Sequence, residues 1–143
     1  MNTKDKLTIT VQTTVKAPLE KTWDLWTLPE HVTNWNFASD DWHSPRATND
    51  LRAGGSFNYR MESKDGSMGF DFEGIYDTVK PLELIEYYLA DQRKVRITFT
   101  SKGNETIVTE SFDTENINSA EMQRTGWQSI LDNFKTYAEN IEN

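Results

Sequence analysis

Glu110 is the polar residue whose position in this sequence most directly suggests chemistry. It stands between Val108 and Phe112 in an alternating stretch, so a strand here would place it on the same face as these two apolar side chains. A buried carboxylate is costly unless it is paired or protonated. Three interpretations follow: the common one, in which the strand bends and Glu110 reaches water, Gln123 or Arg124; a ligand anchor; or a base with a raised pKa.

The other candidate catalytic or metal-binding groups are weaker. Asp71 and Glu73 share one strand face, as the paired carboxylates of a glycosidase would, but alternation puts them on the solvent side. His31 and His43 are the two histidines, and neither has a nucleophile or a set of metal ligands at a recognised spacing. The chain has no cysteine, which excludes thiol nucleophiles and thiolate metal sites. We therefore predict no catalytic residue, no metal and no cofactor.

Aromatic side chains carry much of the apolar mass. Hydrophobic residues make up only 36% of the chain, yet aromatic residues reach 12%. The segment RTGWQSILDNF places Trp127, Ile130, Leu131 and Phe134 on one face of a helix. Such large side chains either fill a core or line a pocket with few residues, and the sequence leaves both possibilities open.

The pattern of the chain predicts which elements position these residues. A strand at about 7–15 is followed by a short helix after Pro18 and a second one that starts at Thr27 and Pro29 and ends near Trp35. A polar loop follows. Further strands are expected at about 46–49, 56–61, 68–79, 82–90, 95–101 and 106–112. The last helix, capped by Asn118 and Glu121, should run for about 22 residues.

Composition narrows the class of protein and its partners. A length of 143 residues favours one domain, covering 1–143. The net charge of −8 disfavours nucleic acid and anionic membranes as partners. The N-terminus has no apolar run of signal-peptide length. We expect a soluble, cytoplasmic protein, either a monomer or a homodimer.

Six segments in order resemble one known family. They are APLEKTWDLWTLPEHVTNWN, DLRAGGSFNYRM, DG, FEGIYDTVKPLELIEY, VRITF and RTGWQSILDNF. Together they resemble the SRPBCC or START-like superfamily and, within it, the AHSA-like family named after an activator of the heat-shock protein 90 ATPase. The resemblance implies a helix-grip fold of the α+β class: a curved antiparallel sheet of six to seven strands around a long C-terminal helix, with two short helices after the first strand. We do not expect this chain to have the co-chaperone activity of that heat-shock protein 90 activator.

The same resemblance implies a hydrophobic cavity between the long helix and the sheet. We predict that it binds a small hydrophobic or aromatic molecule, with Trp26, Trp35 and Phe37 closing one end. The expected lining is Trp26, Trp35, Phe37, Phe57, Tyr59, Phe72, Tyr88, Phe99, Glu110, Phe112, Trp127 and Leu131. Two alternatives stay open. One is an enzyme of the cyclase, dehydratase or hydrolase type that uses Glu110 or Tyr59 as acid or base. The other is a protein-interaction module of the co-chaperone type.

Overall fold

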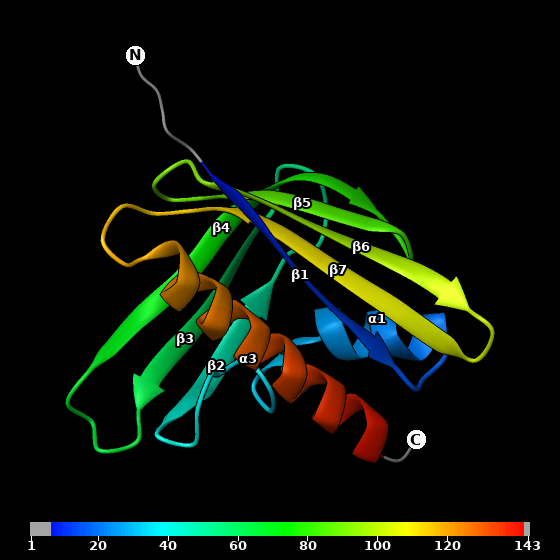
Figure 1. Cartoon of the computed structure of the whole chain (residues 1–143), viewed down its shortest axis with the longest axis horizontal. Coiled ribbons are helices and arrows are strands. Elements are labelled where there is room, and N and C mark those ends of the chain that lie inside the picture. The colour runs from blue at the N-terminus through cyan, green and yellow to red at the C-terminus, as the bar shows by residue number, and fades with distance from the viewer. Residues whose placement is uncertain (1–6, 142–143) are drawn as a thin grey trace.

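A seven-stranded antiparallel sheet forms most of the molecule (Figure 1). The computed structural model describes residues 7–141, so the start of the stretch in which we expected no signal peptide lies outside it. The strands are β1 Thr8–Val15, β2 Trp42–Asn49, β3 Ser56–Ser63, β4 Gly69–Lys80, β5 Leu84–Leu89, β6 Lys94–Lys102 and β7 Glu105–Asp113. Their order is β1-β7-β6-β5-β4-β3-β2, so the meander is closed at one edge by the first strand.

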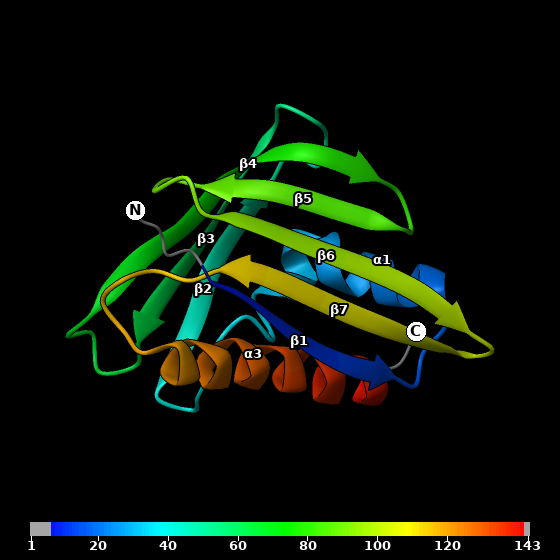
Figure 2. The same cartoon turned by 45° about the horizontal axis from the view of Figure 1, so that its top comes forward.

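Three helices accompany the sheet: α1 Leu19–Thr27, α2 Pro29–Val32 and α3 Ala120–Asn140. Figures 1 and 2 show the sheet curving away from β1 towards β3 and β2, with α3 running along β1 across the open side. The predicted α+β helix-grip fold is therefore confirmed. None of the helices between residues 7 and 141 is long and apolar enough to cross a membrane.

The bend of the sheet has a local cause in β4. Its pairing with β5 shifts register between Tyr76 and Thr78, which marks a bulge. A bulge of this kind increases the local twist and bends the strand. The bend turns the inner face of β4 and β3 towards α3, and this produces a concave surface.

Several predicted boundaries were wrong by a few residues. The cap of α3 is Ser119, whose Oγ accepts a hydrogen bond from the Met122 amide at 3.1 Å, instead of the predicted pair Asn118 and Glu121. Helix α2 ends at Val32, before the predicted end near Trp35. Strand β2 is longer than expected, because it pairs with β3 across an irregular register between His43 and Arg46 that periodicity does not detect.

The closed end of the concave face is filled by aromatic rings. Trp26 packs against Trp35 with ring centroids 4.7 Å apart and against Phe134 of α3 at 4.9 Å. Phe99 of β6 touches both Trp23 and Trp26. All five side chains are buried, so this half of the space between sheet and helices is solid core.

Candidate functional site

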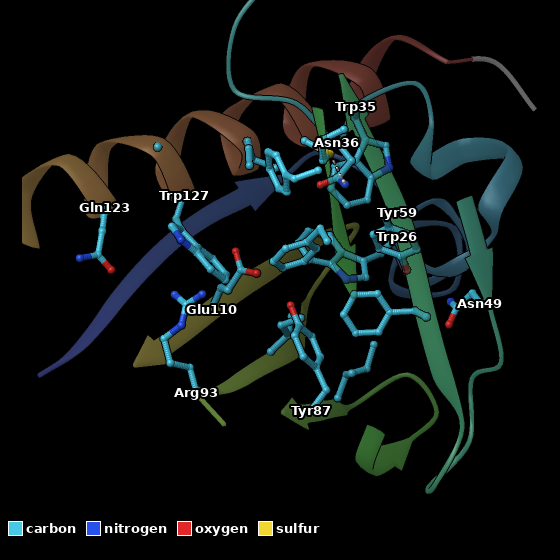
Figure 3. Close-up of a pocket in the computed structure, with 18 of the residues that line it drawn as sticks. Trp26, Trp35, Asn36, Asn49, Tyr59, Tyr87, Arg93, Glu110, Gln123 and Trp127 are labelled. Atoms are coloured by element: carbon cyan, nitrogen blue, oxygen red, sulfur yellow. Dashed lines mark hydrogen bonds between the residues drawn. The ribbon is translucent and has the colours of Figure 1, made fainter. Parts of the chain in front are cut away.

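The other half of the concave face holds a cavity of about 310 Å³. It lies between the N-terminal half of α3 and the inner face of the sheet, as Figure 3 shows. Its wall is mostly aromatic and aliphatic with several polar groups. The lining residues are Trp26, Thr27, Trp35, Asn36, Asn49, Phe57, Tyr59, Met61, Phe70, Phe72, Tyr76, Ile85, Tyr87, Arg93, Ile97, Glu110, Glu115, Asn118, Gln123, Gly126, Trp127 and Ile130.

The exposed lining residues mark where the cavity opens. Phe70, near the start of β4, is 48% exposed, and Asn118, in the segment before α3, is exposed as well. At the opposite end, Trp26 and Trp35 are buried in the aromatic core. The cavity therefore runs from a mouth between the β3–β4 hairpin and the β7–α3 connection to an aromatic floor.

Glu110 lies on the cavity wall without a protein partner. Its side chain projects inward from β7 between Val108 and Phe112, and it is only 5% exposed. No hydrogen bond or ion pair of its carboxyl group occurs within residues 7–141. Burial raises its pKa from 4.5 to about 8, so the group is mainly protonated at neutral pH. The bent-strand interpretation is wrong, because β7 alternates regularly through Glu110 and keeps this side chain away from water. Arg124 does not reach it either, since it donates to the Thr10 carbonyl.

Two further polar side chains lie beside Glu110. Tyr87 and Arg93 line the same cavity as Glu110 and Trp127 (Figure 3), and the charges of both Glu110 and Arg93 act on the Tyr87 hydroxyl. Burial, followed by the charge of Glu110, raises the pKa of the Tyr87 hydroxyl well above its usual value. Arg93 donates from Nε to Asp91 Oδ2 at 2.7 Å, and its two terminal nitrogens make no hydrogen bond within the described chain.

Other polar groups of the wall are already engaged. Tyr76 donates to Asn49 Oδ1 at 2.6 Å, and Asn49 Nδ2 donates to the Thr27 carbonyl at 2.8 Å. Gln123 accepts from the Glu115 amide and donates to the carbonyls of Glu115 and Asn118, which fixes the connection before α3. These groups shape the cavity but have little hydrogen-bonding capacity left for a ligand.

Trp127 is held in place by two neighbouring rings. It stacks on Phe112 with centroids 4.0 Å apart and planes 11° apart, and it meets Phe72 edge-on at 6.1 Å. Gly126 beside it also lines the cavity, and a Cβ added there would meet no atom within 4 Å. A close approach of helix to sheet, which would be one reason for a glycine inside a helix, is therefore absent at Gly126, because open space lies next to it.

The structure brings seven of the twelve predicted lining residues together on this wall: Trp26, Trp35, Phe57, Tyr59, Phe72, Glu110 and Trp127. The other five lie elsewhere. Phe99, Phe112 and Leu131 are buried in the core behind the wall. Tyr88 is 39% exposed on the outer face of β5. Phe37 borders a separate hollow against the outer side of α3.

Tyr87, Arg93, Asn36 and Gln123 are lining residues that the sequence analysis missed. Tyr87 had a usable signal, because it pairs with Tyr76, which shares a strand face with the predicted lining residue Phe72 by alternation. Residues directly opposite in an antiparallel pair share a face. Arg93 offered no such signal, since it lies in a hairpin turn and reaches the wall only through its long side chain.

The remaining sequence candidates lie away from the cavity. Asp71 and Glu73 are exposed on the outer face, as expected. His31 Nδ1 lies 2.7 Å from the Tyr137 hydroxyl, and His43 Nε2 lies 4.0 Å from Glu62 Oε1. Within the described residues, no three histidine or carboxylate groups come together in a way that could hold a metal ion.

Similarity to known proteins places this architecture in one family. The profile described as "Activator of Hsp90 ATPase homolog 1-like protein" matches residues 16–139. A protein from Cytophaga hutchinsonii of known structure is 55% identical, with 92% of each chain covered and a TM-score of 0.80. An AHSA1-like protein from Aeromonas hydrophila is 36% identical over 96% of this chain and 99% of its own, with a TM-score of 0.87.

More distant structures share the fold alone. A protein from Nitrosomonas europaea is 16% identical over 92% of this chain and 93% of its own, with a TM-score of 0.78. The chain matches no curated protein. The family profile extends from the end of β1 to the last turn of α3, so it contains nearly all of the cavity wall. The chain therefore belongs to the family of activator of Hsp90 ATPase homolog 1-like proteins.

Proposed function

We propose that the chain binds a small hydrophobic or aromatic molecule in the cavity between α3 and the sheet. The observation that carries this proposal is a cavity of about 310 Å³ with largely aromatic walls and a partnerless buried carboxyl group. Ligand pockets typically occupy about 300–1,000 Å³ and combine apolar walls with a few polar groups. A solid core would leave neither the space nor the unpaired group.

Gly126 offers a way to block the cavity from the helix side. Because a side chain at this position has open space in front of it, a Gly126→Leu variant should fill part of the cavity without removing any wall contact. Thr125 is exposed on the same helix turn and does not line the cavity. A Thr125→Leu variant is therefore a matched control that adds a similar apolar side chain outside the cavity.

The test is native mass spectrometry of the purified protein, followed by fluorescence titration with apolar aromatic probes. We expect a co-purifying molecule or a probe to bind the unmodified chain and the Thr125→Leu variant. Binding to Gly126→Leu should be at least tenfold weaker. If no molecule co-purifies and no probe binds, the cavity is not a binding site. The interaction-module alternative would then take its place, with the Hsp90-type chaperone named in the family description as the partner to test.

Catalysis in the same cavity is a second candidate, favoured by Glu110. Buried groups with strongly shifted pKa values in a cleft are characteristic of active sites, although structural roles also produce them. A base of this kind would exchange protons next to a bound carbonyl group. Incubation with phenylacetone in deuterated buffer, followed by NMR, tests this directly. Exchange no faster than with a Glu110→Gln variant would exclude proton transfer to this class of substrate.

A further inference from the structure

The polar groups of the cavity wall divide into engaged and unengaged sets. The engaged set makes hydrogen bonds to other residues of the protein and consists of Asn49, Tyr76 and Gln123. Glu110, the Tyr87 hydroxyl and the terminal nitrogens of Arg93 have no protein partner within residues 7–141. These three come from β7, β5 and the turn between β5 and β6 and line the same cavity, and the charges of Glu110 and Arg93 both act on the Tyr87 hydroxyl that lies with them in Figure 3. We call the part of the cavity that they line the donor niche.

All three groups of the donor niche present a proton to the cavity at neutral pH. Arg93 is always protonated, and a tyrosine hydroxyl whose pKa is raised keeps its proton. Glu110 also keeps its proton, because burial disfavours its charged form. A carboxylic acid held neutral in an apolar site donates a hydrogen bond and does not repel an oxygen atom. The donor niche is thus matched to a hydrogen-bond acceptor.

We infer that the ligand is an uncharged aromatic molecule whose carbonyl-type oxygen sits in the donor niche, with its apolar body lying against Trp127, Phe57 and Tyr59. This inference rests on the proposed function, because it names the chemical class of ligand for the same cavity. The aromatic walls supply most of the contact area, and the donor niche fixes the orientation of the ligand.

Charged ligands fit this arrangement less well. An ammonium group would meet the Arg93 guanidinium and two groups that donate hydrogen bonds, so it would find repulsion and few acceptors. A carboxylate would gain from Arg93, but Arg93 is already paired with Asp91 and its side chain is 23% exposed, so solvent weakens this attraction. Moving an ionised carboxylate from water into this apolar cavity also costs free energy, and an uncharged ketone does not carry that cost.

Four probes with one two-ring skeleton separate these possibilities. Benzophenone carries the ketone, diphenylmethane lacks it, diphenylacetate is anionic and benzhydrylamine is cationic. Isothermal titration of the whole chain should show benzophenone binding about tenfold more tightly than diphenylmethane, which is the value of one good hydrogen bond. Diphenylacetate and benzhydrylamine should both bind more weakly than benzophenone.

Variants of the donor niche test the assignment. Tyr87→Phe and Glu110→Met should each reduce the preference for benzophenone over diphenylmethane to about twofold or less, while diphenylmethane still binds. Glu110→Gln keeps a donor and should retain most of the preference. A merely structural role for these residues would weaken both probes equally.

The outcomes are distinguishable. Equal binding of benzophenone and diphenylmethane overturns the donor niche but leaves the proposed cavity function standing. Tightest binding of diphenylacetate or benzhydrylamine overturns the uncharged class in favour of an acid or an amine. Failure of all four probes, together with no co-purifying molecule, overturns both the inference and the proposed function.

Discussion

At the scale of single residues, burial of Glu110 links the stability of the fold to pH. Its pKa is about 8 in the folded chain, against an ordinary value of 4.5 for an exposed carboxyl group. The folded state therefore binds this proton more tightly, and the favourable contribution is complete below about pH 4.5. It is lost as the pH rises towards 8, with a total loss of the order of 4 kcal/mol.

Glu110→Gln should remove this dependence. The variant has no ionisable group at this position, so its free energy of unfolding should stay nearly level between pH 5 and 8 where that of the unmodified chain falls. Urea unfolding at several pH values measures the difference. Glu73→Gln, on the exposed outer face, is the control and should give a curve parallel to that of the unmodified chain. Parallel curves for Glu110→Gln would show that Glu110 is paired or hydrated in solution.

Ligand binding should also depend on the protonation state of Glu110. The other titratable and charged side chains that line the cavity with Glu110 are Tyr59 of β3, Tyr76 of β4, Tyr87 of β5, Arg93 and Glu115. The three tyrosines all have raised pKa values and stay neutral well above pH 8. Loss of an acceptor ligand as the pH passes 8 would therefore report Glu110, and a Glu110→Gln variant should not show it.

At the scale of elements, α3 carries a residue that weakens it. Gly126 lies in the interior of the helix, where glycine costs about 1 kcal/mol relative to alanine. Since a Cβ would meet no atom within 4 Å, Gly126→Ala should raise the free energy of unfolding by about that amount in urea denaturation. A loss of stability would mean that the added methyl group meets a neighbour, and hence that the helix lies closer to the wall.

The cap of α3 is a second position in this helix, where a substitution should lower the free energy of unfolding. Ser119 satisfies the Met122 amide, and its replacement by alanine should cost about 1 kcal/mol. Asn118, the predicted cap, makes its side-chain hydrogen bond to Glu115. Asn118→Ala should therefore leave the helix less affected than Ser119→Ala. Circular dichroism during urea unfolding compares the two variants. An equal or larger effect at Asn118 would contradict the assignment.

Local periodicity was enough to predict most of the fold and part of the site. Strands β3 and β7 alternate clearly, so the inward positions of Phe57, Tyr59 and Glu110 could be predicted from the sequence. The prediction that Tyr88 lines the cavity was wrong. Strand β5 has two adjacent buried residues, Leu84 and Ile85, so the sequence does not show which face of the strand points inward. The free volume could not be predicted either, because it depends on how far the bulged sheet curves from α3, and alternation contains no information on curvature.

At the scale of the whole molecule, the first strand and the last helix connect distant parts of the chain. Strand β1 pairs with β7, from Thr8 opposite Asp113 to Val15 opposite Thr106. Helix α3 is tied to the same strand, because Lys135 donates to the Thr14 carbonyl at 2.7 Å. Helix α3, which forms one wall of the cavity, is thus held against a strand from the other end of the described chain. The site is therefore a product of the finished fold and of no single segment.

The net charge acts on this finished fold as well. A charge of −8 opposes the compact state through self-repulsion. The ion pairs of the described residues, such as Arg52 with Asp50 and Lys135 with Glu139, are local and partly exposed, so each contributes little. Salt weakens both effects, but the unpaired excess of negative charge acts over longer distances. Screening of this excess negative charge should therefore dominate the effect of salt on the stability of the fold.

Raising the NaCl concentration from about 0.01 M to about 0.15 M shortens the screening length from about 30 Å to about 8 Å. The melting temperature should rise by a few degrees. A Glu73→Lys/Asp77→Lys variant, altered at two exposed positions of β4, changes the net charge by +2 at each site, from −8 to −4. Its melting temperature should respond less to salt, because less repulsion remains to be screened. A fall in melting temperature with salt for the unmodified chain would instead mean that its ion pairs outweigh the repulsion of its excess charge.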